Sequence, residues 1–430
     1  MLLKTGITAL AGLLMLSACA KKEDILPGER IGLRTVVEAE DQTIPALNLP
    51  SASVNAAWTH RNGNAAHFVS HPALSSAPKR IWSTDIGAGN KKRQRLASDP
   101  IVAGGRIYTL DVDGTVVAFG LNGAKQWTVP LKLANSPKSD GSGGGLAYAD
   151  GRIAVTTGVG EAVLLDADTG AIQWRHRVSS AISAAPAFDG TTVVVVSGDN
   201  RAVGLDAKNG RIKWAQKSST AGATILGTGA PAIASGVAIV PFGSGEVLGV
   251  VLSNGLQAWN QVINGHRIGS SRGLLKAVSG GPVVVNDTVY AGTNSGRLTA
   301  MDRRSGQRIW TAAEGAIGPV WPAGNSLFVL TDEQKLKRLN REDGSEVWST
   351  DLPLYRKAKK QKGNYGHYGP VLAGGRLYVA GSDGEIRAFD PATGDLVNTI
   401  SISGGAASQV VVAGGRMYVL SNSGQLIAFQ

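Results

Sequence analysis

Few side chains in this 430-residue chain are spaced for metal or acid–base chemistry, and the clearest are three histidines near the N-terminus. His60, His67 and His71 follow the spacing H-x6-H-x3-H, and imidazole nitrogens are common metal ligands. No cysteine or carboxylate stands beside them, so we expect them to pack against the fold. No Ser-His-Asp pattern is evident, and residues 141–145 (GSGGG) lack the Lys-Ser/Thr of a phosphate loop. The sequence therefore predicts no catalytic residue, no metal and no cofactor.

A short box with an acidic residue, a glycine and a tryptophan recurs along the chain. Residues 166–174 read DADTGAIQW, and relatives of this stretch begin at Asp206, Asp302 and Asn340. A glycine four residues before the tryptophan supplies the positive φ of a tight turn. The Asp and Thr side chains can bond nearby backbone N–H groups, and the tryptophan buries a large area. We interpret the box as a turn followed by a wedge between structural units rather than a cofactor motif. The tryptophans expected to dock neighbouring units are Trp82, Trp127, Trp174, Trp214, Trp259, Trp310 and Trp348.

The runs between these boxes predict the elements that carry them. Residues 370–400 (PVLAGGRLYVAGSDGEIRAFDPATGDLVNTI) divide into four short β-prone runs joined by Gly- or Asp-Gly-containing turns. From Trp127 to Trp348, successive tryptophans of the boxes are 38 to 51 residues apart. Four antiparallel strands with this period are typical of a β-propeller blade.

The two ends of the chain are predicted to complete one blade. The last unit, from about Val410, has only three strands, and residues 79–82 (KRIW) can supply the fourth. Such closure leaves no open seam in the ring. We therefore predict an all-β fold, an eight-bladed β-propeller whose last blade is closed by the N-terminal strand. Asn398 stands where the seventh copy should carry a tryptophan.

The first twenty residues indicate export and lipid attachment. Lys4 precedes a short apolar run, residues 7–18, that is too short to span a bilayer comfortably. Residues 16–19 (LSAC) resemble a bacterial lipobox, which implies cleavage before Cys19 and lipid on its thiol. Because Cys19 is the only cysteine, no intrachain disulfide can form. We predict a signal peptide over 1–18, a lipid-anchored flexible tether over 19–57 and the propeller over 58–430.

The formal net charge of the chain is +11. For an exported protein this favours anionic lipid or an acidic protein partner over nucleic acid. By resemblance to bacterial lipoproteins, which tend to stay at the inner membrane when Asp follows the lipidated cysteine, Ala20 implies the periplasmic face of the outer membrane.

The repeat resembles that of pyrroloquinoline-quinone (PQQ) alcohol and glucose dehydrogenases. That resemblance would imply a quinone pocket on the ring axis, a bound Ca²⁺, a catalytic carboxylate and, in many members, a disulfide between adjacent cysteines. This chain has no cysteine pair and no compact acidic cluster for Ca²⁺. A PQQ-dependent oxidoreductase and a cell-wall or polysaccharide-binding propeller remain the alternatives.

The lipobox, the tether and the propeller over residues 58–430 together resemble the BamB family of outer membrane protein assembly lipoproteins. The resemblance implies a non-enzymatic subunit of the β-barrel assembly machinery. Its expected partners are the barrel-forming subunit BamA, other machinery proteins, unfolded outer membrane proteins and the membrane. In the family, an apolar stretch ending in Arg before blade 4 and a loop with paired Asp before blade 5 contact the barrel-forming subunit. The matching stretch 223–227 keeps Ile225 and Leu226 but lacks the Arg, and Ala277 and Ser279 replace the Asp residues.

Long connections between units suggest the binding surface. Residues 128–145, 215–230, 260–281 and 349–369 join the fourth strand of one blade to the first of the next, so all should emerge on one face. Binding residues concentrate on loops held by a rigid scaffold. Basic runs on such connections attract an acidic partner or lipid, or are simply solvated. The candidate partner-binding residues are Ile225, Leu226, Arg267, Arg272, Lys276, Lys91, Lys92, Arg93, Arg356, Lys357, Lys359 and Lys360.

Overall fold

The computed structural model describes residues 45–131, 143–218, 229–265, 267 and 276–430. The chain divides into two units, residues 1–43 and 44–430, and all described residues belong to the second. Within these ranges no helix has the length and apolar character needed to cross a membrane. Cys19, Ile225, Leu226 and Arg272 lie outside the described residues.

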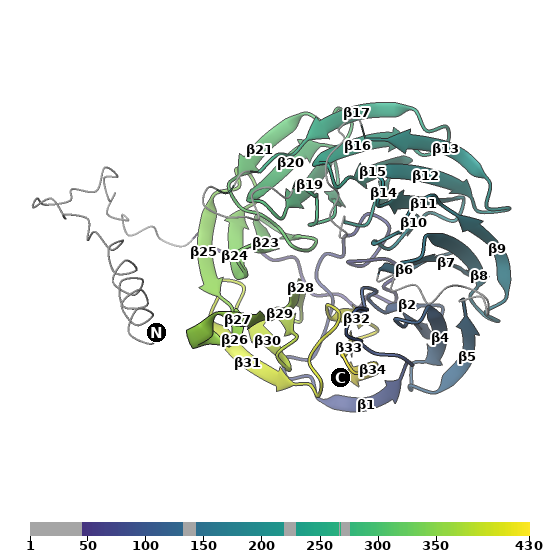
Figure 1. The fold of residues 1–430 in the computed structure, drawn as a ribbon. Coiled ribbons are helices and arrows are strands. Elements are labelled where there is room, and N and C mark those ends of the chain that lie inside the picture. The colour runs from purple at the N-terminus through teal and green to yellow at the C-terminus, as the bar shows by residue number, and fades with distance from the viewer. Residues whose placement is uncertain (1–44, 132–142, 219–228, 266, 268–275) are drawn as a thin grey trace, which may run out of the picture. The chain divides into compact units, whose positions relative to one another are not determined.

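The second unit is a ring of eight four-stranded antiparallel sheets, as predicted (Figure 1). Blade 1 contains β2 (Ile101–Ala103), β3 (Arg106–Leu110), β4 (Thr115–Gly120) and β5 (Lys125–Pro130). Blade 2 contains β6 (Gly144–Ala149), β7 (Arg152–Thr157), β8 (Glu161–Asp166) and β9 (Ile172–Arg177). Blade 3 contains β10 (Ala187–Phe188), β11 (Thr192–Ser197), β12 (Arg201–Asp206) and β13 (Ile212–Lys217). Blade 4 contains β14 (Ala232–Ala234), β15 (Val237–Pro241), β16 (Glu246–Val251) and β17 (Gln257–Val262).

The remaining blades repeat this plan. Blade 5 contains β18 (Val283–Val285), β19 (Thr288–Thr293), β20 (Arg297–Asp302) and β21 (Arg308–Ala312). Blade 6 contains β22 (Trp321–Ala323), β23 (Ser326–Leu330), β24 (Lys335–Asn340) and β25 (Glu346–Asp351). Blade 7 contains β28 (His367–Ala373), β29 (Arg376–Gly381), β30 (Glu385–Phe389) and β31 (Leu396–Ser401). Between blades 6 and 7 a hairpin is formed by β26 (Tyr355–Lys357), the 3-10 turn η2 (Ala358–Lys360) and β27 (Lys362–Asn364).

Blade 8 joins the two ends of the propeller. Its strands β32 (Val411–Ala413), β33 (Arg416–Leu420) and β34 (Gln425–Phe429) are completed by β1 (Arg80–Asp85), which pairs antiparallel with β34. The predicted closure by the N-terminal strand is therefore confirmed.

Hydrogen bonds between turns and connections define two faces of the ring. The residue after a fourth strand donates its N–H to the turn between strands two and three, as Leu131 does to Gly114 and Leu352 to Gln334. We call this side the connection face. On the opposite side, the turn between strands three and four bonds the turn between strands one and two, as Ala167 does to Gly151. We call that side the turn face.

The repeated box packs each blade on the next. In blade 2 the turn glycine, Gly170, has φ +74°, and a Cβ added there would lie 2.9 Å from the Trp127 ring of blade 1. The Trp127 indole N–H donates to the carbonyl of Ala167 at 3.2 Å. Trp174, Trp214, Trp259, Trp310 and Trp348 repeat both contacts on the following blade.

Both seams of blade 8 depart from this pattern. Trp82 packs on Gly123, but its indole N–H is buried without a partner. The turn it covers is one residue shorter than the others, and the Leu121 carbonyl there accepts from Arg416 instead. At the other seam, blade 8 has no turn between its third and fourth strands, because these strands come from opposite ends of the chain. Asn398 therefore has no turn glycine to cover.

Residues 45–74, which we call the axial segment, run across the middle of the ring (Figure 1). They bond every blade at the turn-face ends of the first strands. Their partners in blades 1 to 8 are Val102, Tyr148, Phe188, Ile233, Val284, Trp321, Gly374 and Gly414. Residues 45–57, the end of the predicted tether, lie against the ring in the structure. Arg338 and Asn325 donate to the carbonyls of Pro45 and Ala46, and Gly414 donates to that of Asn55.

The three histidines of the axial segment act as buried hydrogen-bonding groups. His67 bonds the Pro282 carbonyl at 2.8 Å through Nδ1, and His71 bonds the Pro50 carbonyl at 2.7 Å. Nε2 of His60 lies 3.1 Å from the Phe188 backbone nitrogen. Burial lowers the pKa of His60 to about 4 and that of His67 to about 3, so both rings are neutral at neutral pH. Across the described residues, no group of three His, Cys, Asp or Glu side chains could hold a metal ion.

Candidate docking face

The connection face carries every described candidate for partner binding. The residues following β5, β13, β17 and β25 bond the turns between strands two and three, which places the start of each long connection on that face. Residues 86–99, which follow β1, lie there too, since Asn90 bonds Asn422 in the turn between β33 and β34. The connection face is thus built from loops of variable length on a rigid ring.

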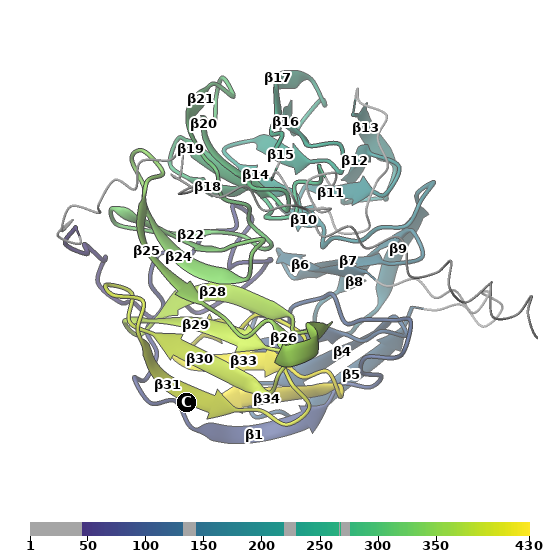
Figure 2. The same ribbon diagram turned by 60° about the vertical axis from the view of Figure 1, so that its left-hand side comes forward.

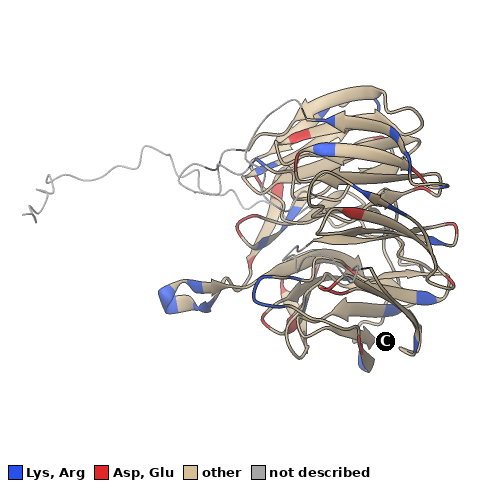
Figure 3. Cartoon of the chain, turned by 45° about the vertical axis from the view of Figure 1, so that its right-hand side comes forward, with Lys and Arg blue, Asp and Glu red and all other residues tan. Residues whose placement is uncertain are grey.

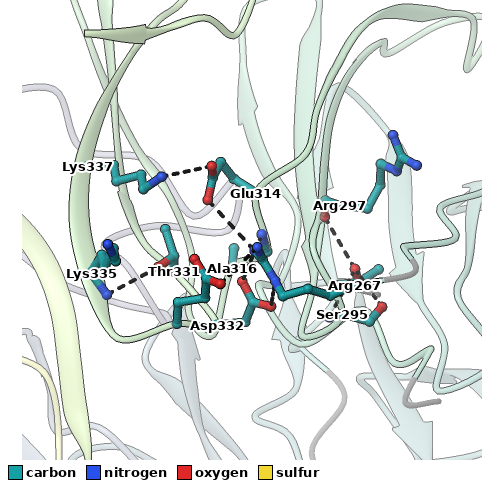
Figure 4. Close-up of polar contacts among 12 residues, drawn as sticks. Arg267, Ser295, Arg297, Glu314, Ala316, Thr331, Asp332, Lys335 and Lys337 are labelled. Carbon is teal, nitrogen blue, oxygen red and sulfur yellow. Dashed lines mark hydrogen bonds and ion pairs between the residues drawn. The ribbon is translucent and has the colours of Figure 1, made fainter. Parts of the chain in front are cut away.

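Arg267 lies on the connection between blades 4 and 5 and is held by carboxylates of blades 5 and 6 (Figure 4). Its Nε and Nη2 donate to the two Asp332 carboxylate oxygens at 3.0 and 2.9 Å. Nη1 lies 3.0 Å from a Glu333 oxygen, and Nη2 lies 3.8 Å from Glu314. The bond to Asp332 raises the pKa of the guanidinium, despite partial burial.

The same network continues into blade 6. Lys337 donates to Glu314 at 2.8 Å and to Glu346 at 2.6 Å. Asp332 also accepts from the Gly315 backbone N–H at 3.0 Å, and its side chain is only 3% exposed. The sequence predicts a partner contact for Arg267, and the structure pairs its guanidinium with carboxylates of its own chain. Its carboxylate partners were missed because Asp332 stands 65 residues away.

The end of this connection is mostly buried. Lys276 is exposed. Ala277 is only 2% exposed, and the Ser279 hydroxyl donates to the Ala316 carbonyl at 2.8 Å. Val278 exchanges backbone hydrogen bonds with Gly229 and Phe242. Only Lys276 in this short stretch is exposed enough to meet another molecule.

The basic run at residues 91–95 is partly engaged within the chain. Lys91 forms an ion pair with Asp113, in the turn between β3 and β4. Lys92 and Arg93 are exposed. This run therefore presents charge on the connection face, although part of that charge is already compensated.

The second basic run forms the hairpin between blades 6 and 7. Arg356, Lys357, Lys359 and Lys360 are all exposed. In Figure 2 the hairpin lies in front of the blades, and in Figure 3 the element that projects from the ring is blue. The sequence predicts a basic loop here, and the structure folds this run into a short hairpin.

Comparison with known proteins identifies the family. A family model described as "Outer membrane protein assembly factor BamB" matches residues 112–350 and 334–430. The outer membrane protein assembly factor BamB of Salmonella typhimurium is 32% identical over 72% of this chain and 78% of its own length. That of Escherichia coli K12 is 30% identical over 74% and 80%. The chain belongs to the BamB family.

Solved structures agree on the fold. BamB from Moraxella catarrhalis superposes with a TM-score of 0.70 at 18% identity, covering 82% of this chain and all of that one. A quinohemoprotein alcohol dehydrogenase from Comamonas testosteroni gives 0.67 at 12% identity, covering 88% and 81%. The propeller architecture is thus shared with a dehydrogenase. The family assignment rests on the sequence similarity to BamB proteins.

Two positions before blade 5 differ from the pattern that the family resemblance implies. The resemblance implied that paired acidic side chains at positions 277 and 279 contact the barrel-forming subunit. Here these positions hold a buried alanine and a serine bonded within the chain.

Proposed function

We propose that this BamB-family protein is a non-enzymatic scaffold subunit of the β-barrel assembly machinery, and that it docks on the barrel-forming subunit through its connection face. The observation that carries the proposal is family membership together with a rigid ring whose long connections gather on one face. A rigid scaffold presenting loops loses little conformational entropy on binding. The proposed anchor at Cys19 would hold it at the outer membrane, facing the periplasm.

The site residues do not favour the dehydrogenase alternative. A quinone site of that type needs Ca²⁺ held by carboxylate oxygens, and the described residues offer no such cluster. The turn-face end of the ring axis is filled by the axial segment, with Trp58 and His67 fully buried. These features support a binding role for the ring.

The outer edge of blade 7 offers a surface for unfolded clients. β31 is an edge strand that pairs only with β30, and it contains neither a tryptophan nor a charged residue. Leu396 and Val397 are 54% and 48% exposed. Extended chains can add to an exposed sheet edge through backbone hydrogen bonds. We propose that unfolded outer membrane proteins pair transiently with β31.

Affinity purification from solubilised membranes tests the assignment. A C-terminally tagged full-length chain should recover the barrel-forming subunit of the machinery. Recovery of the chain without any assembly subunit would reject the proposal. Catalysis is tested separately, because dye-linked oxidation of alcohols or sugars after addition of PQQ and Ca²⁺ would establish an enzyme.

A paired substitution tests the docking face. Lys276→Glu on the connection face should lower recovery of the partner. The control, Lys208→Glu, reverses one exposed charge on the turn face and should leave recovery unchanged. Equal effects of the two changes would show that net charge rather than the connection face governs docking.

A further inference from the structure

The hairpin between blades 6 and 7 concentrates uncompensated positive charge. Arg356, Lys357, Lys359, Lys360 and Lys362 are all exposed, and none forms an ion pair within the described part of the chain. No acidic residue occurs from residue 352 to residue 382. Elsewhere on the connection face, cations such as Lys91 and Arg267 are paired with carboxylates.

The hairpin also holds like charges against each other. In the register of β26 and β27, Lys357 stands directly opposite Lys362. Like charges at directly opposed positions destabilise a strand pair. An external anion would remove that cost, so the arrangement is suited to a bound state in which negative charge lies against the hairpin.

The base of the hairpin is fixed to the ring. The Tyr365 N–H donates to the Leu354 carbonyl at 2.9 Å, and His367 bonds the Pro353 carbonyl at 2.8 Å. The Arg356 guanidinium lies 5.8 Å from the centre of the Tyr365 ring. These contacts keep the charged tip projecting from the ring (Figures 2 and 3).

The residue types decide which anionic surface fits the tip. Protein interfaces are enriched in arginine and aromatic residues and depleted in lysine, whereas four of these five cations are lysines. The tip, from Ala358 to Gln361, carries no apolar or aromatic anchor of the kind that dominates protein–protein affinity. Lysine is a compact, strongly hydrated charge suited to diffuse attraction, and clusters of four or more basic residues bind anionic lipid surfaces. A projecting tip is also the part of a ring that a flat surface can reach.

We propose that the hairpin 355–364 binds the anionic phospholipid headgroups of a bilayer, so that the connection face is held at the membrane surface. The described chain begins at Pro45, on the turn face. Cys19 precedes it by 26 residues, and an extended chain of that length reaches roughly 90 Å. A lipid anchor at Cys19 would therefore allow the connection face to meet the membrane. The lipid contact stands independently of docking on the barrel-forming subunit.

Vesicle binding tests the proposal. The chain from residue 20 contains all eight blades and the axial segment, and it lacks the lipidated cysteine. It should co-sediment with phosphatidylcholine vesicles containing roughly a third phosphatidylglycerol, and not with phosphatidylcholine alone. Each cation at an anionic surface contributes about fivefold in affinity. Replacing Lys357, Lys359, Lys360 and Lys362 together by Gln should therefore weaken binding by up to several hundredfold, and by no less than about tenfold, while replacement by Arg should preserve it.

A matched control separates the hairpin from net charge. Lys125, Lys208, Arg211 and Arg308 are exposed cations on outer strands and turn-face turns, and changing all four to Gln removes the same charge. The control should bind within about twofold of the parent chain. Equal weakening of both variants, or no binding of the parent to anionic vesicles, would overturn the proposal.

A photo-crosslinking residue at position 359 of the full-length protein tests the same contact in intact membranes. Crosslinks to phospholipid support the proposal. Crosslinks to a discrete protein band without lipid would overturn it and assign the hairpin to an acidic protein. Circular dichroism of each vesicle-assay variant verifies that the ring is folded, so a loss of binding reports on the hairpin.

Discussion

Mild acid should loosen the propeller through the two fully buried histidines of its axial segment. His67 donates from Nδ1 to the Pro282 carbonyl, and its Nε2 is buried without a partner. A proton on Nε2 would place a charged N–H where no acceptor is available. Burial is the main cause of the low pKa of His67, and the nearby His60 and Arg61 lower it further. Burial likewise dominates for His60, against smaller opposing effects of the Phe188 backbone and the Asp189 carboxylate.

Proton linkage gives the direction and the magnitude of the change in the free energy of unfolding with pH. Both pKa values fall in the folded state, from 6.5 to about 4 for His60 and to about 3 for His67. The unfolded chain therefore binds more protons below pH 6.5, and the free energy of unfolding falls as pH is lowered. Between pH 7 and pH 5 each histidine should remove about 2 kcal/mol, or about 4 kcal/mol together. The lowered pKa of His367 acts in the same direction. The raised pKa values of Asp99 and Asp111 act in the opposite direction, because as the pH falls these folded carboxyl groups bind protons before the unfolded chain does, and they offset part of the histidine effect.

Urea unfolding followed by tryptophan fluorescence at pH 7 and pH 5 measures this effect. His67→Gln keeps a hydrogen-bonding group but does not titrate, so the loss of unfolding free energy between the two pH values should shrink by about 2 kcal/mol. The control is His176→Gln, since His176 lies on the outer strand β9 and is only partly buried. That control should leave the pH dependence unchanged. The reasoning fails if the parent protein is equally stable at both pH values, or if His67→Gln retains the full pH dependence.

Further substitutions test the packing of the ring. Gly210→Ala should destabilise the protein by about 2–5 kcal/mol, since φ is +70° and the new Cβ would meet the indole of the preceding blade at 2.8 Å. Gly236→Ala, at φ +75° with open space around it, should cost only about 1–2 kcal/mol in the same urea titration. Equal losses for the two variants would show that the tryptophan does not pack closely on the turn glycine. Arg267→Ala should cost about 2–4 kcal/mol by removing both guanidinium bonds to the buried Asp332 carboxylate. Additivity with Asp332→Asn in a double-mutant cycle would contradict their coupling. Asn398→Trp should change the free energy of unfolding by less than about 0.5 kcal/mol in the same urea titration, because no turn receives the indole. A gain above about 1 kcal/mol would show that the seam can accept it.

The repeating part of the fold could be predicted because the residues that determine each blade lie close together in the sequence. The turn glycine and tryptophan recur with each box, and alternating apolar residues mark the strands between them. Closure by residues 79–82 followed from counting strands, since the last unit lacked one. The same logic marked Asn398 as an exception. The absence of a turn between β34 and β1 explains why no tryptophan is needed at that position.

The axial segment and the Arg267 network were not predictable in the same way. The contacts of residues 45–74 differ from blade to blade, so they leave no period in the sequence. Residues 45–57 end a longer stretch, 20–57, whose prolines and mixed charges are typical of a linker, although Trp58 and the three histidines that follow could have indicated burial. Arg267 looked like a free surface cation because its carboxylate partners stand 47 to 66 residues away. Only the ring geometry brings these groups together.

Closure of blade 8 makes the protein sensitive to the completeness of its own synthesis. β1 is made early but must wait for β34, residues 425–429, which come from the far end of the chain. A chain stopped shortly before residue 425 would hold seven finished blades and an eighth lacking its middle, with unpaired strand edges on both sides of the gap. Such edges invite aggregation and proteolysis. The ring can therefore close only after the last strand has been made. A prematurely terminated product should be degraded instead of accumulating as a shorter ring.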